Sequence, residues 1–229
     1  MNTPAATLEG KVALITGARG GLGAAVTEAF LQAGANVIGV SRSIRAEDFP
    51  HPNFTAIAAE LSSGDAARKT IEDAGARFGR IDALIHLMGG FAGGQSVADT
   101  DDATIEKMLD LNYRAAFYVL RAVIPRMRAQ GGGRIVAVAS RQGLEPSAAV
   151  GAYSASKAAL VSLVKTVALE NKDAGIAANT VLPGGMNTPG NPGTKLIQTA
   201  HVAALLVWLA GDGAAAVTGA AIPVYGAQL

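Results

Sequence analysis

Short apolar runs alternate with longer amphipathic segments along the chain. The apolar runs are bounded by Gly, Asp, Asn or Pro, which is typical of buried strands. They occur at residues 11–16, 36–41, 54–59, 82–88, 134–140, 177–183 and 220–225. Strands this apolar are buried on both faces, so the pattern predicts a mostly parallel, seven-stranded sheet with helices on each side.

The segments between these runs carry the signals of helices. Ser62 and Ser63 are N-cap residues, and the glycines at 131–133 stop a long amphipathic helix. We expect helices at residues 21–33, 62–79, 102–130, around residue 153, and at 199–211. Strands that alternate with helices predict an α/β fold of the doubly wound, Rossmann type. Because the chain has no internal repeat or linker, we expect one domain over residues 1–229.

Composition narrows the function classes. The chain contains no cysteine, which excludes disulfides and thiolate chemistry. Its net charge is +1 without a basic cluster, so neither a nucleic-acid surface nor a membrane patch is indicated. No apolar run reaches membrane-spanning length, and residues 1–11 lack the basic and apolar regions of a signal peptide. We therefore expect a cytoplasmic protein.

A glycine-rich segment follows the first predicted strand. In TGARGGLGAAV (16–26), Gly17, Gly21 and Gly23 have a G-x-x-x-G-x-G spacing. Glycines at such a place let the backbone turn tightly and approach a pyrophosphate, whose charge is met by the amides of the next helix. A glycine cluster alone is also typical of an ordinary turn, but its position after the first strand favours nucleotide binding.

A tyrosine and a lysine lie four positions apart in AYSASKAAL (152–160). On a helix, Tyr153 and Lys157 share one face, so the phenol and the ammonium can reach a common point. A nearby cation favours the phenolate form of tyrosine, which suits a proton donor or acceptor in alcohol–carbonyl interconversion. The pair alone is weak evidence, because two ordinary helix residues have the same spacing.

Together these segments resemble the short-chain dehydrogenase/reductase family. TGARGGLG matches the family's T-G-x-x-x-G-x-G motif, YSASK its Y-x-x-x-K motif, and NTVLPGGMNT (179–188) its N-x-V-x-P-G motif. TGAAIPVYG (218–226) is similar to the family's C-terminal motif. Ser140, thirteen residues before Tyr153, and Asn112 stand at the places of the catalytic serine and asparagine. The resemblance covers nearly the whole chain.

The resemblance implies an oxidoreductase that interconverts a carbonyl and an alcohol. Its catalytic residues would be Asn112, Ser140, Tyr153 and Lys157. Tyr153 would protonate the carbonyl oxygen as hydride arrives from the nicotinamide. Lys157 would lower the pKa of the phenol and bind the nicotinamide ribose. Ser140 would orient the substrate oxygen, unless it only caps the following turn, and Asn112 would support a water that leads to the lysine.

The resemblance also implies a set of cofactor-binding residues. They are Gly17, Arg19, Gly20, Gly21, Leu22, Gly23, Ser41, Arg42, Glu60, Leu61, Met88, Gly89, Gly90, Tyr153, Lys157, Pro183, Gly184, Met186 and Thr188.

The end of the second strand bears on the choice of cofactor, because it lies beside the adenosine ribose in this architecture. Ser41 stands there in place of the aspartate of NAD-preferring relatives, and Arg42 offers a charged fork suited to a 2′-phosphate. Arg19 could add a second positive charge. We therefore expect NADP(H), with NAD(H) also usable if Arg42 is only solvated or stacks on the adenine.

Three positions depart from the family pattern. His86 in HLMG replaces the first asparagine of N-N-A-G, and we expect a hydrogen-bonded structural role for it. No second histidine or carboxylate stands at metal-ligand spacing around it, so we predict no metal. Tyr225 replaces the usual aspartate near the C-terminus. Residues 189–198 are too short and too rich in Gly and Pro for a substantial lid, so the substrate site should be open or completed by a neighbouring subunit.

Several alternatives stay open for the activity. GGFAGG (89–94) and LPGGMNTP (182–189) resemble the dihydropteridine reductase branch, which generally lacks a serine like Ser140. A 3-oxoacyl-[acyl-carrier-protein] reductase is a further alternative, although the chain shows no basic surface for an acidic carrier. A non-enzymatic dinucleotide sensor is disfavoured because all four catalytic positions are kept. We expect a small-molecule carbonyl or alcohol substrate.

The family precedent and the apolar helices also predict self-assembly. The helix at 102–130 and the helix that carries Tyr153 offer more apolar surface than one sheet face can cover. We expect a homotetramer, or else a homodimer, formed through these helices.

Overall fold

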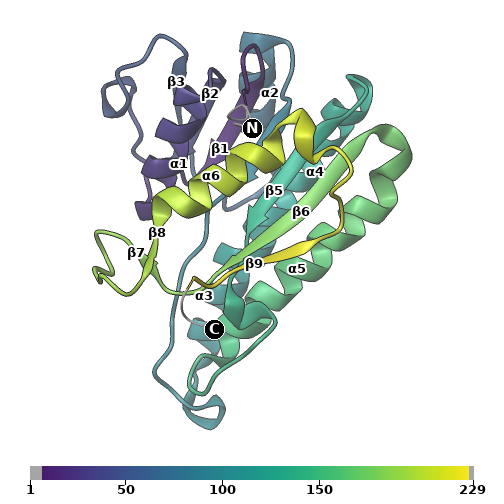
Figure 1. The fold of residues 1–229 in the computed structure, drawn as a ribbon. Coiled ribbons are helices and arrows are strands. Elements are labelled where there is room, and N and C mark those ends of the chain that lie inside the picture. Colours follow the sequence, from purple (N-terminus) through teal and green to yellow (C-terminus); the bar gives the residue numbers. More distant parts are fainter. Residues whose placement is uncertain (1–6, 227–229) are drawn as a thin grey trace.

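The computed structural model describes residues 7–226, and its centre is a seven-stranded sheet (Figure 1). The strands are β1 (Val12–Thr16), β2 (Asn36–Ser41), β3 (Phe54–Ala58), β4 (Ala83–His86), β5 (Gly133–Val138), β6 (Ile176–Pro183) and β9 (Ala221–Val224). Their order is β3-β2-β1-β4-β5-β6-β9, and every neighbouring pair is parallel. The predicted doubly wound α/β fold is therefore confirmed.

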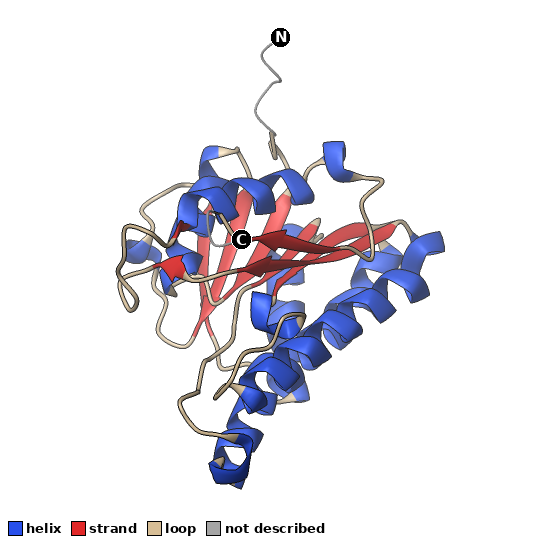
Figure 2. Cartoon of the chain, turned by 60° about the horizontal axis from the view of Figure 1, so that its bottom comes forward, coloured by secondary structure: helices blue, strands red, loops and turns tan. Residues whose placement is uncertain are grey.

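Helices cover both faces of this sheet, as the second view shows (Figure 2). They are α1 (Gly21–Gln32), α2 (Gly64–Phe78), α3 (Asp102–Leu109), α4 (Ala115–Ala129), α5 (Gly151–Asn171) and α6 (Thr199–Ala210). Helices α1 and α6 pack on one face, and α2, α4 and α5 pack on the other.

The two faces have separate cores because neighbouring strand residues point to opposite sides. Ile15 and Ile85 belong to the core beneath α1 and α6, whereas Leu14 and Leu84 belong to the core beneath α2, α4 and α5. All four side chains are fully buried. The continuous apolar runs in the sequence are thus explained by strands that are covered on both sides.

The helix ends follow the local signals in the sequence. The Ser63 hydroxyl accepts a hydrogen bond from the Ala66 amide at 3.2 Å, and the Asp101 carboxylate accepts one from the Thr104 amide at 2.7 Å. Both bonds satisfy amides that have no partner within the helix. Gly79 ends α2 with φ = 75°, a conformation in which glycine avoids a side-chain clash.

The helix predicted over residues 102–130 has an irregular centre. It consists of α3, a five-residue π-helical segment at Asp110–Arg114, and α4. The hydrophobic pattern did not distinguish this segment from α-helix. Within it, the buried Asn112 side chain makes a tertiary contact with Gly90. π-Helical turns of this kind occur mainly at functional sites.

Residues 186–198 contain no helix that could form a substantial lid, but they do contain extended structure. Two short strands, β7 (Met186–Asn187) and β8 (Ile197–Gln198), pair with each other and bring residues 186–198 into a compact loop. These strands could not be predicted from the sequence, because two-residue ladders have no hydrophobic period of their own.

Within residues 7–226, no helix is long and apolar enough to cross a membrane. Residues 1–6 and 227–229 lie outside the described part of the chain. The expectation that residues 1–11 carry no export signal therefore falls partly on residues of which the structure says nothing.

Candidate active site

A cleft opens where the order of the strands reverses. The chain runs from β1 to β2 and β3 on one side, and then crosses to β4 on the other side of β1. Ligands of doubly wound sheets bind at this point, outside the carboxyl ends of the strands. The cleft has a volume of about 1210 Å³. Its walls include the predicted cofactor residues Gly17, Arg19, Gly20, Ser41, Arg42, Glu60, Leu61, Met88 and Gly89.

The glycines of the turn after β1 are required by its geometry. Gly17 has φ = 72°, and a Cβ atom on it would lie 3.0 Å from the amide nitrogen of Met88. A Cβ atom on Gly23 would lie 2.0 Å from the carbonyl oxygen of Gly17, which is a severe clash. The turn is therefore closed tightly against α1, and the backbone amides at the start of α1 stay accessible to an anion. This arrangement fits a dinucleotide.

Polar side chains gather at the end of the cleft beside β2. The Ser41 hydroxyl accepts a hydrogen bond from the Arg19 amide at 3.2 Å, and Arg19 Nη1 donates to the Ser43 hydroxyl at 2.9 Å. Arg19 Nε lies 3.2 Å from a carboxylate oxygen of Asp48. Arg19 is thus an ion-paired residue and not the unpaired second charge that the sequence suggested. The exposed Arg42 has no ion pair or hydrogen bond to residues 7–226.

Ser43 and Asp48 were missed by the sequence reasoning. Ser43 also lines the cleft, together with Ser62 and the α3 residues Glu106 and Lys107. Ser43 could have been found, because it follows the strand end by two residues. Asp48 could not, because its contact with Arg19 joins two loops that are far apart in the sequence.

Ser140 and Tyr153 meet at the edge of a second cleft. Ser140 follows β5, and its hydroxyl accepts a hydrogen bond from the Gln142 amide at 3.3 Å. The same side chain lowers the pKa of the Tyr153 phenol, so the two groups are close enough to interact. Ser140 thus caps the next turn and also faces Tyr153, and its role toward a substrate stays a prediction. Two hydroxyl groups converge on one point, which is the arrangement needed to hold a single oxygen atom.

The environment of Tyr153 differs from the expectation. Burial raises the pKa of its phenol, and the hydrogen bond with Ser140 opposes this rise. Lys157 Nζ lies 6.0 Å from the centre of the Tyr153 ring and donates a hydrogen bond to the Val138 carbonyl at 3.1 Å. The ammonium points to the backbone of β5, so the predicted lowering of the phenol pKa by Lys157 is not seen. Tyr153 is protonated at neutral pH.

Lys157 itself is a buried cation without a carboxylate partner among residues 7–226. Burial lowers the pKa of its ammonium to about 8. The charged form is stable in water but not in an apolar interior, so a buried lysine loses its proton more easily.

Asn112 holds the loop after β4. Its carbonyl oxygen accepts a hydrogen bond from the Gly90 amide at 2.9 Å, and its amide donates to the Gly90 carbonyl at 3.0 Å and to the Ser156 hydroxyl at 3.1 Å. A Cβ atom on Gly89 would lie 2.7 Å from the Asn112 side-chain oxygen and 3.1 Å from Lys157 Nζ. Asn112 therefore fixes the loop close to Lys157, and the π-helical segment turns its side chain inward.

His86 is fully buried at the end of β4. Its Nδ1 atom is 2.9 Å from the Thr16 hydroxyl, so it joins β4 to β1, in keeping with the predicted structural role. Its Nε2 atom has no hydrogen-bond partner among the described residues. Burial, and then the charge of Lys157, lower its pKa to about 3, so the imidazole is neutral. No group of three potential metal ligands occurs in the described part of the chain.

The second cleft has a volume of about 1150 Å³ and extends from Ser140 and Tyr153. The Phe91 ring packs edge-on against Tyr153, with 4.9 Å between the ring centres. The opposite wall comes from residues 184–191, including the predicted cofactor residues Gly184, Met186 and Thr188. Phe91 could have been found from GGFAGG, because an exposed aromatic residue in a glycine-rich loop is unusual.

Tyr225 ties the C-terminal strand end to the loop after Ser140. The guanidinium of Arg141 lies 4.7 Å from the centre of the Tyr225 ring, and Arg141 Nε donates to the Glu145 carboxylate at 2.7 Å. The Tyr225 phenol is hydrogen-bonded to Glu145 as well. The departure from the family's aspartate thus has a structural consequence, a three-residue cluster beside the second cleft.

Other predicted cofactor residues do not form the walls of either cleft. Leu22 and Gly23 are buried in the first turn of α1, Pro183 is buried at the end of β6, and Gly90 is bonded to Asn112. Gly21 packs against Thr188, because a Cβ atom there would lie 2.9 Å from the Thr188 side chain. These residues support the clefts from behind.

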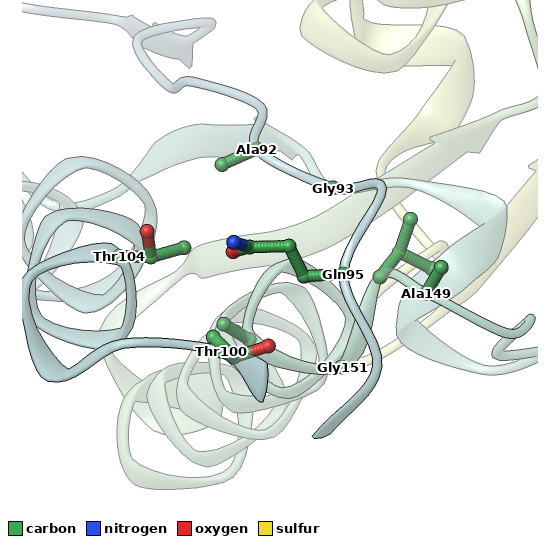
Figure 3. Close-up of a pocket in the computed structure, with 9 residues that line it drawn as sticks. Ala92, Gly93, Gln95, Thr100, Thr104, Ala149 and Gly151 are labelled. Atoms are coloured by element: carbon green, nitrogen blue, oxygen red, sulfur yellow. The ribbon is translucent and has the colours of Figure 1, made fainter. Parts of the chain in front are cut away.

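A small pocket of about 100 Å³ lies between the loop after β4 and the start of α5 (Figure 3). The side chain of Gln95 extends into it toward Thr104 of α3. None of the predicted site residues lines this pocket, so it is a packing gap apart from the two clefts.

The buried lysine predicts a pH-dependent stability. Between about pH 8 and pH 10.5 the unfolded chain keeps the Lys157 proton and the folded chain releases it, so the free energy of unfolding rises with pH there. Relative to Lys157→Met, the wild type should gain up to about 3 kcal/mol from pH 7 to pH 10.5. Urea denaturation of both proteins across this range measures the change. Lys165→Met removes an exposed lysine of the same helix, so its stability difference from the wild type should not change with pH. If the stability difference between Lys157→Met and the wild type were also constant across this range, the prediction would be wrong.

Comparisons with known proteins agree with this geometry. The short chain dehydrogenase family model matches residues 11–195. The short-chain dehydrogenase/reductase cdmF of Talaromyces verruculosus is 34% identical, over 95% of this chain and 96% of that protein. The D-beta-hydroxybutyrate dehydrogenase of Rhizobium meliloti is 32% identical, over 94% of this chain and 97% of that protein.

A solved structure gives the same result in three dimensions. The 3-ketoacyl-(acyl-carrier-protein) reductase of Brucella melitensis, complexed with NADH, has a TM-score of 0.89 at 27% identity, and covers 97% of this chain and 99% of that one. The chain therefore belongs to the short-chain dehydrogenase/reductase family, oxidoreductases that act on alcohol and carbonyl groups.

Proposed function

We propose that the protein interconverts a small-molecule carbonyl compound and its alcohol with NADP(H), and that Tyr153 is the general acid and base. The observation that carries this proposal is the convergence of the Ser140 and Tyr153 hydroxyls at the edge of the second cleft. These hydroxyls lie near the first cleft. Gly89, in the wall of that cleft, packs against Lys157, which is on the same helix as Tyr153.

The bound nicotinamide supplies or accepts the hydride at the substrate carbon. In reduction, the Tyr153 hydroxyl gives its proton to the carbonyl oxygen, and the Ser140 hydroxyl donates a hydrogen bond to the same oxygen. The raised pKa of Tyr153 suits this direction, because the group that must donate a proton carries one at neutral pH. In oxidation the same two groups hold the alcohol oxygen. Only the phenolate form of Tyr153 can then take up the alcohol proton, and the raised pKa makes this the minor form at neutral pH.

Lys157 and Asn112 act behind these two hydroxyls. We propose that Lys157, held by the Val138 carbonyl, binds the nicotinamide ribose and restores the proton of Tyr153. A pKa of about 8 allows Lys157 to exchange protons near neutral pH, which an ordinary lysine does less readily. Asn112 fixes the Gly90 loop that closes this region.

The preference for NADP(H) is supported by charge at the β2 end of the cleft. Arg42 lacks an acidic partner among residues 7–226, and Ser41 and Ser43 offer hydroxyl groups beside it. The aspartate that would repel a 2′-phosphate is absent from position 41. The Brucella melitensis structure contains NADH, so this proposed preference rests on the residues at the β2 end of the cleft and not on that relative.

The other activities rank below this proposal. No relative named above is a dihydropteridine reductase, and Ser140 stands at the edge of the cleft where that branch generally lacks a serine. A 3-oxoacyl-[acyl-carrier-protein] reductase activity is the second candidate, favoured by the open second cleft and the likeness to the Brucella melitensis enzyme. A dinucleotide sensor would not need the Ser140–Tyr153 contact.

Assembly, domain content and location complete the proposal. Exposed Phe117 on α4 and Leu169 on α5 support an interface on that face, and exposed Trp208 on α6 supports another on the opposite face. A tetramer with two-fold symmetry uses two different self-complementary interfaces, so we propose a homotetramer.

A single sheet spans residues 12–224, which supports one domain for residues 1–229. The cytoplasmic location stays a prediction.

Loss of the proton donor should abolish turnover. Tyr153→Phe keeps the packing of the ring against Phe91 and removes only the hydroxyl, so kcat should fall by at least about 100-fold. Dinucleotide binding, measured by fluorescence titration, should stay within about twofold, because one hydroxyl contributes little to a large ligand. Tyr113→Phe, in the π-helical segment directly after Asn112, is the matched control. Near-normal activity of Tyr153→Phe would show that another group transfers the proton.

The unpaired arginine should set the choice of cofactor. Arg42→Ala removes a charge that faces the 2′-phosphate, so kcat/KM for NADPH should fall by about tenfold or more while the value for NADH stays nearly constant. Steady-state kinetics with both cofactors measure the ratio. Arg45→Ala removes a nearby exposed arginine that does not line the cleft, and it should leave the ratio unchanged. A wild type that prefers NADH would refute the proposed preference.

Light scattering at micromolar concentration should give the mass of four chains. Phe117→Glu places a charge on the exposed face of α4 and should yield a smaller species, because an unpaired charge is costly in an apolar interface. A monomer in the wild type would rule out the proposed assembly.

A further inference from the structure

The rim of the dinucleotide cleft contains an ion pair that the family motifs do not explain. Arg19 lies in the loop between β1 and α1, and Asp48 lies in a single helical turn, Ala46–Asp48, after β2. Arg19 Nε and the Asp48 carboxylate are 3.2 Å apart. Half of the Arg19 side chain is exposed, at 52%, compared with 22% for Asp48. Arg19 is therefore the exposed member of the pair and lines the cleft, whereas Asp48 is the more buried member.

Asp48 is held from its own side of the pair. The Arg45 amide donates a hydrogen bond to the Asp48 carboxylate at 2.8 Å, and the Asp48 amide donates to the Arg45 carbonyl at 3.2 Å. The carboxylate is thus fixed by its own turn and would stay in place if Arg19 moved. A fixed anion near the cleft acts on any anionic ligand that approaches Arg19.

The donors of Arg19 are already engaged. Nε faces Asp48, and Nη1 donates to the Ser43 hydroxyl at 2.9 Å. A guanidinium binds a phosphate best through two parallel N–H groups, either Nε with one Nη or both Nη groups. The edge that contains Nε has this donor taken by Asp48, and Nη1 uses one of its two N–H groups on Ser43. A phosphate can bind Arg19 through the Nε edge only if Asp48 gives up its contact.

We propose that Asp48 is a specificity-determining residue, which competes with the 2′-phosphate of the dinucleotide for Arg19 and so limits the discrimination between NADP and NAD. This inference rests on the proposed function, in which Arg42 and the serines meet that phosphate. NAD has an uncharged hydroxyl at the same place, which neither needs a full arginine fork nor is repelled by a carboxylate. Asp48 therefore weakens the binding of one cofactor and leaves that of the other unchanged.

The same contact could also have the opposite role, and the two roles predict opposite changes in the affinity for a 2′-phosphorylated ligand. If Asp48 only positioned Arg19 for the phosphate, its loss would weaken binding of the phosphorylated ligand. If Asp48 competes with the phosphate, its loss strengthens that binding.

The test uses two adenosine fragments that need no turnover. Adenosine 2′,5′-bisphosphate and 5′-AMP are titrated calorimetrically into the wild type and into Asp48→Asn. The asparagine keeps an acceptor for the Arg45 amide and removes the charge, and Asp48→Ser repeats the comparison with a shorter side chain. We expect Asp48→Asn to bind the bisphosphate about fivefold more tightly and to bind 5′-AMP with unchanged affinity.

Two further variants show whether the effect acts through Arg19. Glu47→Gln removes an exposed negative charge from the same turn, and should change neither affinity by more than about twofold. In an Arg19→Ala background, Asp48→Asn should no longer strengthen binding of the bisphosphate. Unchanged or weaker bisphosphate binding by Asp48→Asn, or the same gain without Arg19, would overturn the proposal.

The same titrations test the role of Asp48 and the proposed NADP preference separately. A wild type that binds 5′-AMP more tightly than the bisphosphate would refute the NADP preference. The comparison between wild type and Asp48→Asn would still show whether Asp48 opposes the 2′-phosphate.

Discussion

The close approach between the turn after β1 and the end of β4 is the constraint on which both clefts depend. Gly17 has room for no side chain against the Met88 backbone, and Gly23 has none against the carbonyl of Gly17. This packing fixes α1 at the carboxyl edge of the sheet, where strand order reverses, and leaves its first amides accessible. Every functional contact described above is arranged around that edge.

The catalytic region is built on a cation held by neutral partners. Lys157 is bonded to the Val138 carbonyl, and Asn112 holds the adjoining loop through Gly90. Without a carboxylate partner among the described residues, the ammonium has a lowered pKa and neighbours a neutral His86. Burial of this ammonium costs stability at neutral pH, and perturbed pKa values of this kind cluster at functional sites. Burial favours the neutral form of Tyr153 as well, but because this form is the protonated one, the pKa of the phenol is raised.

The two clefts differ in how firmly the chain closes them. The first cleft lies between the carboxyl edge of the sheet, the turn after β2 and α3. The second cleft is bounded by Phe91, the loop after Ser140 and the short β7–β8 ladder, and the cluster of Arg141, Glu145 and Tyr225 braces one side of it. The first cleft is thus formed largely at the edge of the sheet, whereas the second is formed largely by loops, where binding residues of proteins are often found.

The layered fold could be predicted from the sequence, because buried strands appear as apolar runs. The candidate site residues Gly17, Ser140, Tyr153 and Lys157 could be named only because several motifs occur together in one order, since each spacing alone is weak evidence. Tertiary structure decided what those residues experience. Only the folded chain shows the contact of Asn112 with Gly90, the burial that raises the pKa of Tyr153, and the ion pair of Arg19 with Asp48. Such contacts join segments distant in the chain, and electrostatic energies depend on distance and burial, which spacing along the sequence does not report.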